Sequence, residues 1–206
     1  MEKKVILSTA LMPNIDYIST IASSDVIEIE AFETYKKQTY RNRYEIAGPN
    51  GRQALSVPVN KNGMTNCPVG EVRVSYDNNW LKNHIKSIET AYNSSPFFLY
   101  YKDEFFDIFK KKHEFLFEMN KEFLQLILKI LEIDKQIHFT TEFKKTYEPE
   151  ILDLREKISP KKPRLHKTYT PYYQVFMEKN GFIEDLSVLD LIFNMGPESR
   201  DFLIFE

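Results

Sequence analysis

Apolar and polar positions in the first third of the chain follow patterns typical of β-strands. Val5–Ala10 is a short apolar run, and Asp25–Phe32 alternates between apolar and acidic residues as a half-exposed strand does. Tyr40–Ala47 and Arg52–Val59 flank Gly-Pro-Asn-Gly, and an Asn-Gly pair between two β-prone runs predicts a hairpin. Glu71–Tyr76 predicts a further strand. We expect the strands before residue 77 to form one sheet, mixed or antiparallel.

Helical spacing first appears at Ile15–Ala22 and dominates after residue 77. Trp80–Tyr92 has a single apolar face, and Lys102–Ile133 is a long helical region whose second half is apolar on most sides. The residues of the first of these faces are Trp80, His84, Ile88 and Ala91. Leu186–Asn194 predicts a last helix, ended by Gly-Pro.

The order of these elements determines the expected fold class. Phe139–Phe143 is interpreted as an edge strand, and the proline-rich, basic stretch Lys157–Pro171 as an exposed irregular segment. Strands followed by helices favour an α+β fold, with a mixed α/β fold as the alternative. We expect the C-terminal helices to pack on the N-terminal sheet within one domain, 1–206.

Composition narrows the class of protein. The 206 residues carry a net charge of −2, which gives no general attraction to nucleic acid. Hydrophobic residues make up 42% and charged residues 28%, which is typical of a globular chain. No apolar run approaches the roughly 20 residues of a membrane helix, and the N-terminus lacks a signal-peptide pattern. We therefore predict a cytoplasmic protein that does not insert into membranes.

The densest polar cluster is the segment 36–43. On a strand, Arg41 and Arg43 would project to one face, with Gln38, Tyr40 and Asn42 on the other. Two guanidinium groups on one face suit a phosphate or carboxylate, because each offers paired donors at fixed geometry. The alternative is a solvated face whose cations are balanced by glutamates between residues 28 and 33.

His84 is the second candidate. A histidine on an otherwise apolar helix face has little access to water and could be tuned as a general base. Equally, it could be a core residue hydrogen-bonded to a backbone carbonyl. The turn at Ser94-Ser95-Pro96 could line a pocket. No histidine or cysteine spacing predicts a metal site, and no motif identifies a cofactor, which stays unknown.

Several of these segments together resemble the WbqC-like protein family, in the branch found in Bacteroidetes-type bacteria. The resemblance extends over nearly the whole chain. It is carried by Gln38-Thr39-Tyr40-Arg41-Asn42-Arg43, Leu55-Ser56-Val57-Pro58-Val59, Trp80-x-x-x-His84, Ala91-Tyr92, Ser95-Pro96-Phe97-Phe98, Asp153-Leu154-Arg155, Leu189-Asp190-Leu191 and Gly196-Pro197. The proline–aromatic–proline opening common in the family is replaced here by Leu11-Met12-Pro13-Asn14-Ile15.

This resemblance implies an enzyme of surface polysaccharide (O-antigen) biosynthesis that transfers glycine or another acyl group to an amino sugar on a nucleotide carrier. In that hypothesis Arg41 and Arg43 bind the carrier phosphate or a carboxylate, and His84 deprotonates the attacking amine from the same concavity. The remaining substrate-binding candidates are Gln38, Tyr40, Asn42, Tyr92 and Ser95. The alternative is a non-catalytic module that binds a nucleotide, a sugar or a protein.

Overall fold

The computed structural model describes residues 3–61, 63–166 and 168–203, and its strands fall into three separate sheets. The largest contains β1 (Lys4–Ser8), β2 (Val26–Glu30), β7 (Ile137–Phe139) and β8 (Ile151–Asp153) in the order β7-β2-β1-β8. The others are the hairpin of β3 (Arg43–Gly48) and β4 (Gly51–Ser56), and the short pair of β5 (Val59–Asn60) and β6 (Arg73–Val74). The fold is α+β, as the sequence predicts, but the expectation of one sheet before residue 77 is wrong.

All three pairings in the largest sheet are parallel, so the carboxyl ends of its strands meet at one edge. The chain passes outward from β1 to β2 and β7, and β8 then returns to the other side of β1. Such a reversal of strand order is where open parallel sheets commonly bind ligands, outside the carboxyl ends of the strands. We call this part of the molecule the carboxyl edge.

The early helix α1 (Ile15–Ala22) lies between β1 and β2 and has the predicted bounds. The Asn14 side chain caps it by accepting a hydrogen bond from the Tyr17 amide, at 3.4 Å. The Tyr17 hydroxyl in turn donates to the Ser8 carbonyl at 2.8 Å. The cap and this bond fix the start of α1 beside the end of β1.

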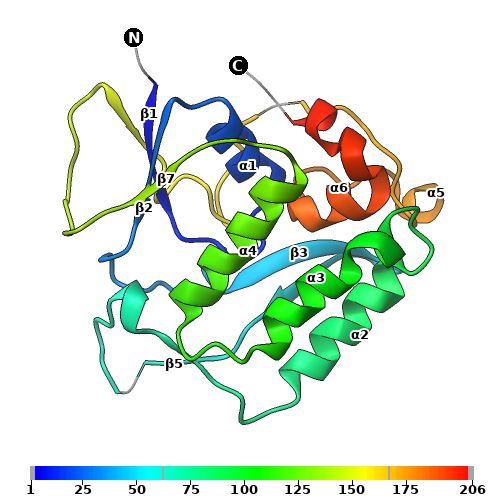
Figure 1. Cartoon of the computed structure of the whole chain (residues 1–206), viewed down its shortest axis with the longest axis horizontal. Helices are drawn as coiled ribbons and strands as arrows, with labels where there is room; N and C mark the ends of the chain where they lie inside the picture. The colour runs from blue at the N-terminus through cyan, green and yellow to red at the C-terminus, as the bar shows by residue number, and fades with distance from the viewer. Residues whose placement is uncertain (1–2, 62, 167, 204–206) are drawn as a thin grey trace.

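The remaining helices cover the hairpin and part of the sheet (Figure 1). They are α2 (Trp80–Tyr92), α3 (Phe98–Lys110), α4 (Leu116–Ile130), the short α5 (Met177–Asn180) and α6 (Val188–Met195). The predicted apolar face of α2 is buried. The region expected to be helical over 102–133 forms two helices, because the chain turns between them with Lys112 at a φ of 53°.

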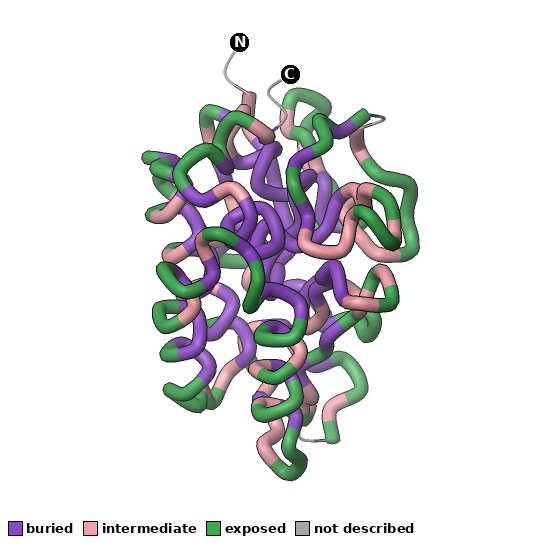
Figure 2. The backbone as a smooth tube through the Cα atoms, turned by 90° about the vertical axis from the view of Figure 1, so that its right-hand side faces the viewer, coloured by how far each residue is buried: buried purple, intermediate pink, exposed green. Residues whose placement is uncertain are grey.

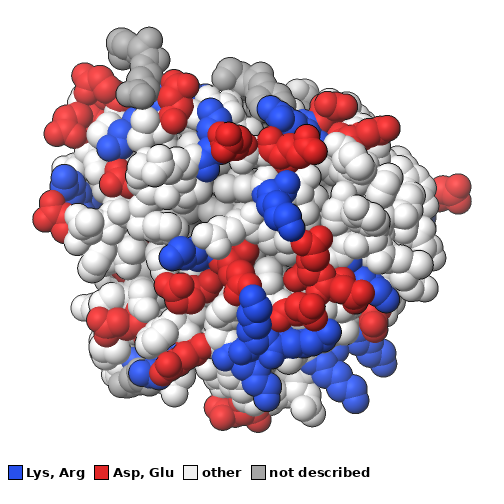
Figure 3. Space-filling model, viewed as in Figure 1, with Lys and Arg blue, Asp and Glu red and all other residues white. Residues whose placement is uncertain are grey.

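One cluster of buried side chains joins strands and helices, and Figure 2 shows buried backbone through the centre of the molecule. Helix α4 connects its parts: Phe117 contacts Phe139 of β7, and Phe123 contacts Phe105 and Phe109 of α3. Over the face seen in Figure 3, acidic and basic side chains are interspersed in small clusters. Among the described residues, no helix is long and apolar enough to cross a membrane.

Candidate functional site

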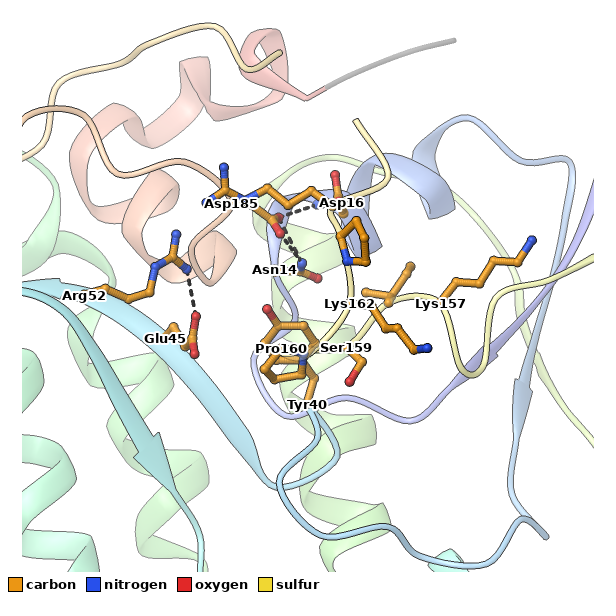
Figure 4. Close-up of a pocket in the computed structure, with 13 residues that line it drawn as sticks. Asn14, Asp16, Tyr40, Glu45, Arg52, Lys157, Ser159, Pro160, Lys162 and Asp185 are labelled. Carbon is orange, nitrogen blue, oxygen red and sulfur yellow. Dashed lines mark hydrogen bonds and ion pairs between the residues drawn. The ribbon is translucent and has the colours of Figure 1, made fainter. Parts of the chain in front are cut away.

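A cavity of about 270 Å³ lies beside the carboxyl edge (Figure 4). Asn14 and Asp16 from the start of α1 border it, opposite Glu45 and Arg52 of the β3–β4 hairpin. Tyr40 and Asp185 complete the wall, together with residues of the segment 157–164. We call this cavity the central cavity and the segment 157–164 the strap.

Asp185 is the best-positioned ionisable group in the central cavity. Its carboxylate accepts two hydrogen bonds from the Asn14 amide, at 2.9 and 2.8 Å, and one from the Asp16 backbone amide at 3.1 Å. Burial, followed by repulsion from the Asp16 carboxylate, raises the pKa of Asp185 to about 7. A carboxyl group that titrates near neutral pH can both accept and donate a proton under ordinary conditions.

Asp16 supplies the carboxylate that lies beside Asp185, and we call the two the Asp16–Asp185 pair. It accepts hydrogen bonds from the Leu165 amide at 2.8 Å and from the Tyr169 hydroxyl at 2.6 Å. Burial is the main cause that raises the pKa of Tyr169, so this hydroxyl stays protonated and donates. The contacts to Asp16 therefore fasten the chain that follows the strap to the start of α1.

Charged side chains on the opposite wall are linked to one another by ion pairs and hydrogen bonds. Glu45 accepts from Arg43 Nη2 through one carboxylate oxygen and from Arg52 Nη1 through the other, both at 2.7 Å. Arg52 also donates to the Glu184 carbonyl, and Glu184 forms an ion pair with Arg164 of the strap. The hairpin, the strap and the segment before α6 are thereby linked around the cavity mouth.

Among the sequence candidates, only Tyr40 borders the central cavity. Arg41 and Arg43 do not share a ligand-facing concavity as expected, because β3 begins at Arg43 and its alternation does not include Arg41. Arg41 is 3% exposed and pairs with Glu33, and it borders a void of about 10 Å³. Arg43 is held by Glu45.

The neighbouring polar candidates also have partners within the protein. Gln38 is exposed, has a φ of 58° and accepts a hydrogen bond from Lys161 at 2.6 Å. The Asn42 amide donates to the Val57 carbonyl at 2.7 Å and so holds the link between β4 and β5. Whether either side chain contacts a ligand stays a prediction.

His84 lies in the core and not in the concavity that we expected. It is 3% exposed, with Nδ1 3.1 Å from the Tyr44 hydroxyl and Nε2 3.3 Å from the Ser56 carbonyl oxygen. Burial lowers its pKa to about 4. The cause of the difference is that α2 docks on the face of β3 that carries Tyr44, away from the neighbouring Arg43. The geometry is that of a neutral, hydrogen-bonded core histidine.

Tyr92 and Ser95 also lie in the core. The Tyr92 hydroxyl donates to Asp190 at 2.8 Å, and the Ser95 hydroxyl donates to the Tyr92 carbonyl at 2.7 Å. Asp190 further accepts from the Tyr172 hydroxyl and the Gln174 amide, at 2.7 and 2.9 Å. These contacts join α2 to α6. Tyr92 and Ser95 do not border the central cavity, and their role in substrate binding stays a prediction.

Sequence reasoning missed Asp16, Asp185 and the strap as parts of one site. An acidic residue in the first turn of a helix is ordinary helix electrostatics, so Asp16 gave no distinctive signal. Asp185 is 169 residues away along the chain. Its positive φ of 50° is invisible in a pattern of polar and apolar residues. Within the described part of the chain, no group of three or more His, Cys, Asp or Glu residues could hold a metal ion.

Comparison with known proteins agrees with the resemblance inferred from the motifs. Residues 9–163 match the WbqC-like protein family, so the chain belongs to that family. It is similar to "Uncharacterized protein Rv1507c" from Mycobacterium tuberculosis (strain ATCC 25618 / H37Rv). The two are 25% identical over 236 residues, with 98% of each chain covered. No solved structure matches the chain significantly.

Proposed function

We propose that the central cavity binds a small polar metabolite and that Asp185 acts as a general base on its amine or hydroxyl group. The observation that carries this proposal is a carboxyl group with a pKa of about 7, 4% exposed and bordering a cavity at the carboxyl edge. Perturbed carboxyl groups in clefts are characteristic of acid–base sites. An amine would meet two carboxylates at the Asp16–Asp185 pair, although four arginines and lysines also border the cavity.

The reaction class that fits is transfer of an acyl or aminoacyl group to an amino sugar, which is the activity implied by the family resemblance. The bound ammonium group would first lose one proton to water, and the resulting neutral amine would then attack the acyl carbon of an activated donor, forming the new carbon–nitrogen bond. The bond from that carbon to the leaving group would break, and the leaving group would depart with its electron pair. Asp185 would take the proton released by the nitrogen. The role in surface polysaccharide biosynthesis rests on the resemblance alone.

A matched pair of sugars tests the site. We expect UDP-glucosamine to bind more tightly than UDP-N-acetylglucosamine, because only the free amine carries a charge for the Asp16–Asp185 pair. Asp185→Asn should weaken UDP-glucosamine binding at least tenfold, measured by titration calorimetry. Asp103→Asn, at an exposed position on α3, is the control and should change nothing. Equal affinities for the two sugars in the wild type would contradict the proposal.

Catalysis is tested separately from binding. With glycyl and acetyl donors present, product formation should increase as pH rises through about 7, because the base acts when Asp185 is deprotonated. Asp185→Asn should abolish that dependence and lower turnover by roughly 10²–10⁴-fold. Binding without turnover for every donor would instead support the non-catalytic binding module.

A further inference from the structure

A second cavity, of about 440 Å³, also lies at the carboxyl edge. Residues that follow β2 and β8 border it, and so does the segment between β7 and β8. We call it the outer cavity. Lys157 borders both cavities, and in Figure 4 its side chain extends from the strap away from Glu45 and Arg52.

An exposed aromatic ring is fixed at the wall of the outer cavity. Phe143 is 54% exposed, and the Arg155 guanidinium lies 5.4 Å from its ring centre. The same guanidinium lies 4.9 Å from the centre of the Tyr147 ring. Arg155 is itself held by both carboxylate oxygens of Asp153, at 2.9 and 2.6 Å. The cation therefore positions Phe143 and leaves ring surface facing the cavity.

The lysines of this cavity outnumber the carboxylates that are free to neutralise them. Glu33 pairs with Arg41, and Asp153 with Arg155. Glu156 pairs with Lys36 at 2.8 Å between two side chains that are more than half exposed. Lys145 and Lys157 form no ion pair among the described residues. Lys157 also interacts electrostatically with Asp153. The outer cavity thus offers two ammonium groups outside these ion pairs, together with an exposed ring.

We propose that the outer cavity binds a nucleoside diphosphate. The base would stack on Phe143, and the phosphates would contact Lys145 and Lys157. Nucleic-acid bases stack favourably on aromatic rings, and lysine ammonium groups are common phosphate ligands. Because Lys157 borders both cavities, the sugar of a nucleotide-linked ligand would extend into the central cavity. Only this last step rests on the proposed function.

The test uses UDP and ADP as probes, with binding measured by titration calorimetry. Phe143→Ala should weaken both at least tenfold, and Phe143→Tyr should retain affinity because it keeps an aromatic ring. Tyr173→Ala removes an exposed aromatic ring elsewhere and should have no effect. Inorganic pyrophosphate lacks a base, so its weaker binding should be insensitive to Phe143→Ala.

The lysines are tested by Lys145→Gln and Lys157→Gln, with the exposed Lys86→Gln on α2 as control. Each of the first two should lower UDP affinity several-fold and reduce its dependence on salt. Absence of UDP and ADP binding at millimolar concentration would overturn the inference, and so would affinity unchanged by Phe143→Ala. Asp185→Asn should leave UDP affinity intact, so failure of the amine site and failure of the nucleotide site give different results.

Discussion

His84 illustrates how its surroundings decide the role of a single residue. Its ring contacts Trp80 and Phe109 edge-on and is hydrogen-bonded at both nitrogens. The sequence predicted that α2 buries this residue, because the apolar face of the helix is a local pattern. It could not reveal whether the buried ring would meet a ligand or Tyr44, since that depends on how α2 docks against β3.

We predict that His84→Gln lowers the free energy of unfolding at pH 7 by about 1–3 kcal/mol through altered buried hydrogen bonds. His84→Gln should also reduce the loss of folding stability that the wild type shows as pH falls. The folded protein lowers the pKa of His84 from 6.5 to about 4, so protonation of the unfolded state destabilises the fold as pH falls from 6.5 towards 4. Between pH 7 and pH 5 this contribution is about 2 kcal/mol.

Urea unfolding of both proteins at the two pH values measures this contribution. The difference in unfolding free energy between wild type and variant must be compared at each pH, because Asp185 and Asp190 change stability with pH in the opposite direction to His84. Their pKa values are raised by folding, to about 7 and about 6, so they favour the folded state as pH falls. A gap between the two proteins that is the same at pH 5 and pH 7 would contradict the assignment of a neutral core histidine.

The elements differ in how well the sequence predicts them. Helices α1 and α2 have the predicted bounds, because apolar spacing in both and the Asn14 cap of α1 act within a few residues. The β3–β4 hairpin likewise forms around Asn50-Gly51, where Gly51 adopts a φ of 96°. Strand β8 was not predicted: it has three residues and gains its pairing from β1, which lies far away in sequence.

Close packing between the end of α6 and the start of α3 predicts that Gly196 cannot be replaced without loss of stability. Gly196 ends α6 with a φ of 55°, and a Cβ atom there would overlap the Phe97 ring. The Phe97 amide also donates to the Phe193 carbonyl at 3.0 Å, which fixes the two helices at close approach. Gly196→Ala should therefore lower the free energy of unfolding by about 3 kcal/mol or more, from steric overlap and backbone strain together.

Gly181→Ala is the matched control, because Gly181 also has a positive φ of 71° but no atom within 4 Å of the position that an added methyl group would take. It should lose only the backbone contribution, about 1–3 kcal/mol, because its φ of 71° and ψ of 178° lie in a region that glycine alone adopts readily. Thermal melting of the two variants separates packing from strain. Equal losses in both would mean that the contact between Gly196 and Phe97 is not limiting.

At the scale of the whole molecule, the fold depends on contacts between distant segments. The parallel sheet assembles β1 and β2 with β7 and β8, which follow them by more than 100 residues. Segments that follow these strands border both cavities. Local patterns predict the elements but not this assembly, so the sequence indicated the α+β class and missed the separation into three sheets.

Arg41 connects β1, the segment after β2 and helix α4. Its Nε donates to Glu33 at 2.8 Å, its Nη2 donates to Ser8 at the end of β1 at 2.9 Å, and its carbonyl accepts from Asn120 of α4 at 2.8 Å. The side chains of Arg41 and Glu33 are both almost fully buried. Removing one partner of such a pair leaves an uncompensated charge, whereas replacing both with apolar residues is far less costly.

We therefore predict that Arg41→Met lowers the free energy of unfolding by about 3–5 kcal/mol, and that adding Glu33→Leu recovers a substantial part of the loss. Urea unfolding of the two single variants and the double variant gives the coupling energy. The exposed pair Lys129–Glu104, at 3.2 Å, is the control, and its coupling should be below about 1 kcal/mol. Coupling at Arg41–Glu33 no larger than at the surface pair would contradict this structural role.

If Arg41 instead bound a ligand from a solvent-accessible site, Arg41→Met would weaken binding and leave stability nearly unchanged, which is opposite to the expected result.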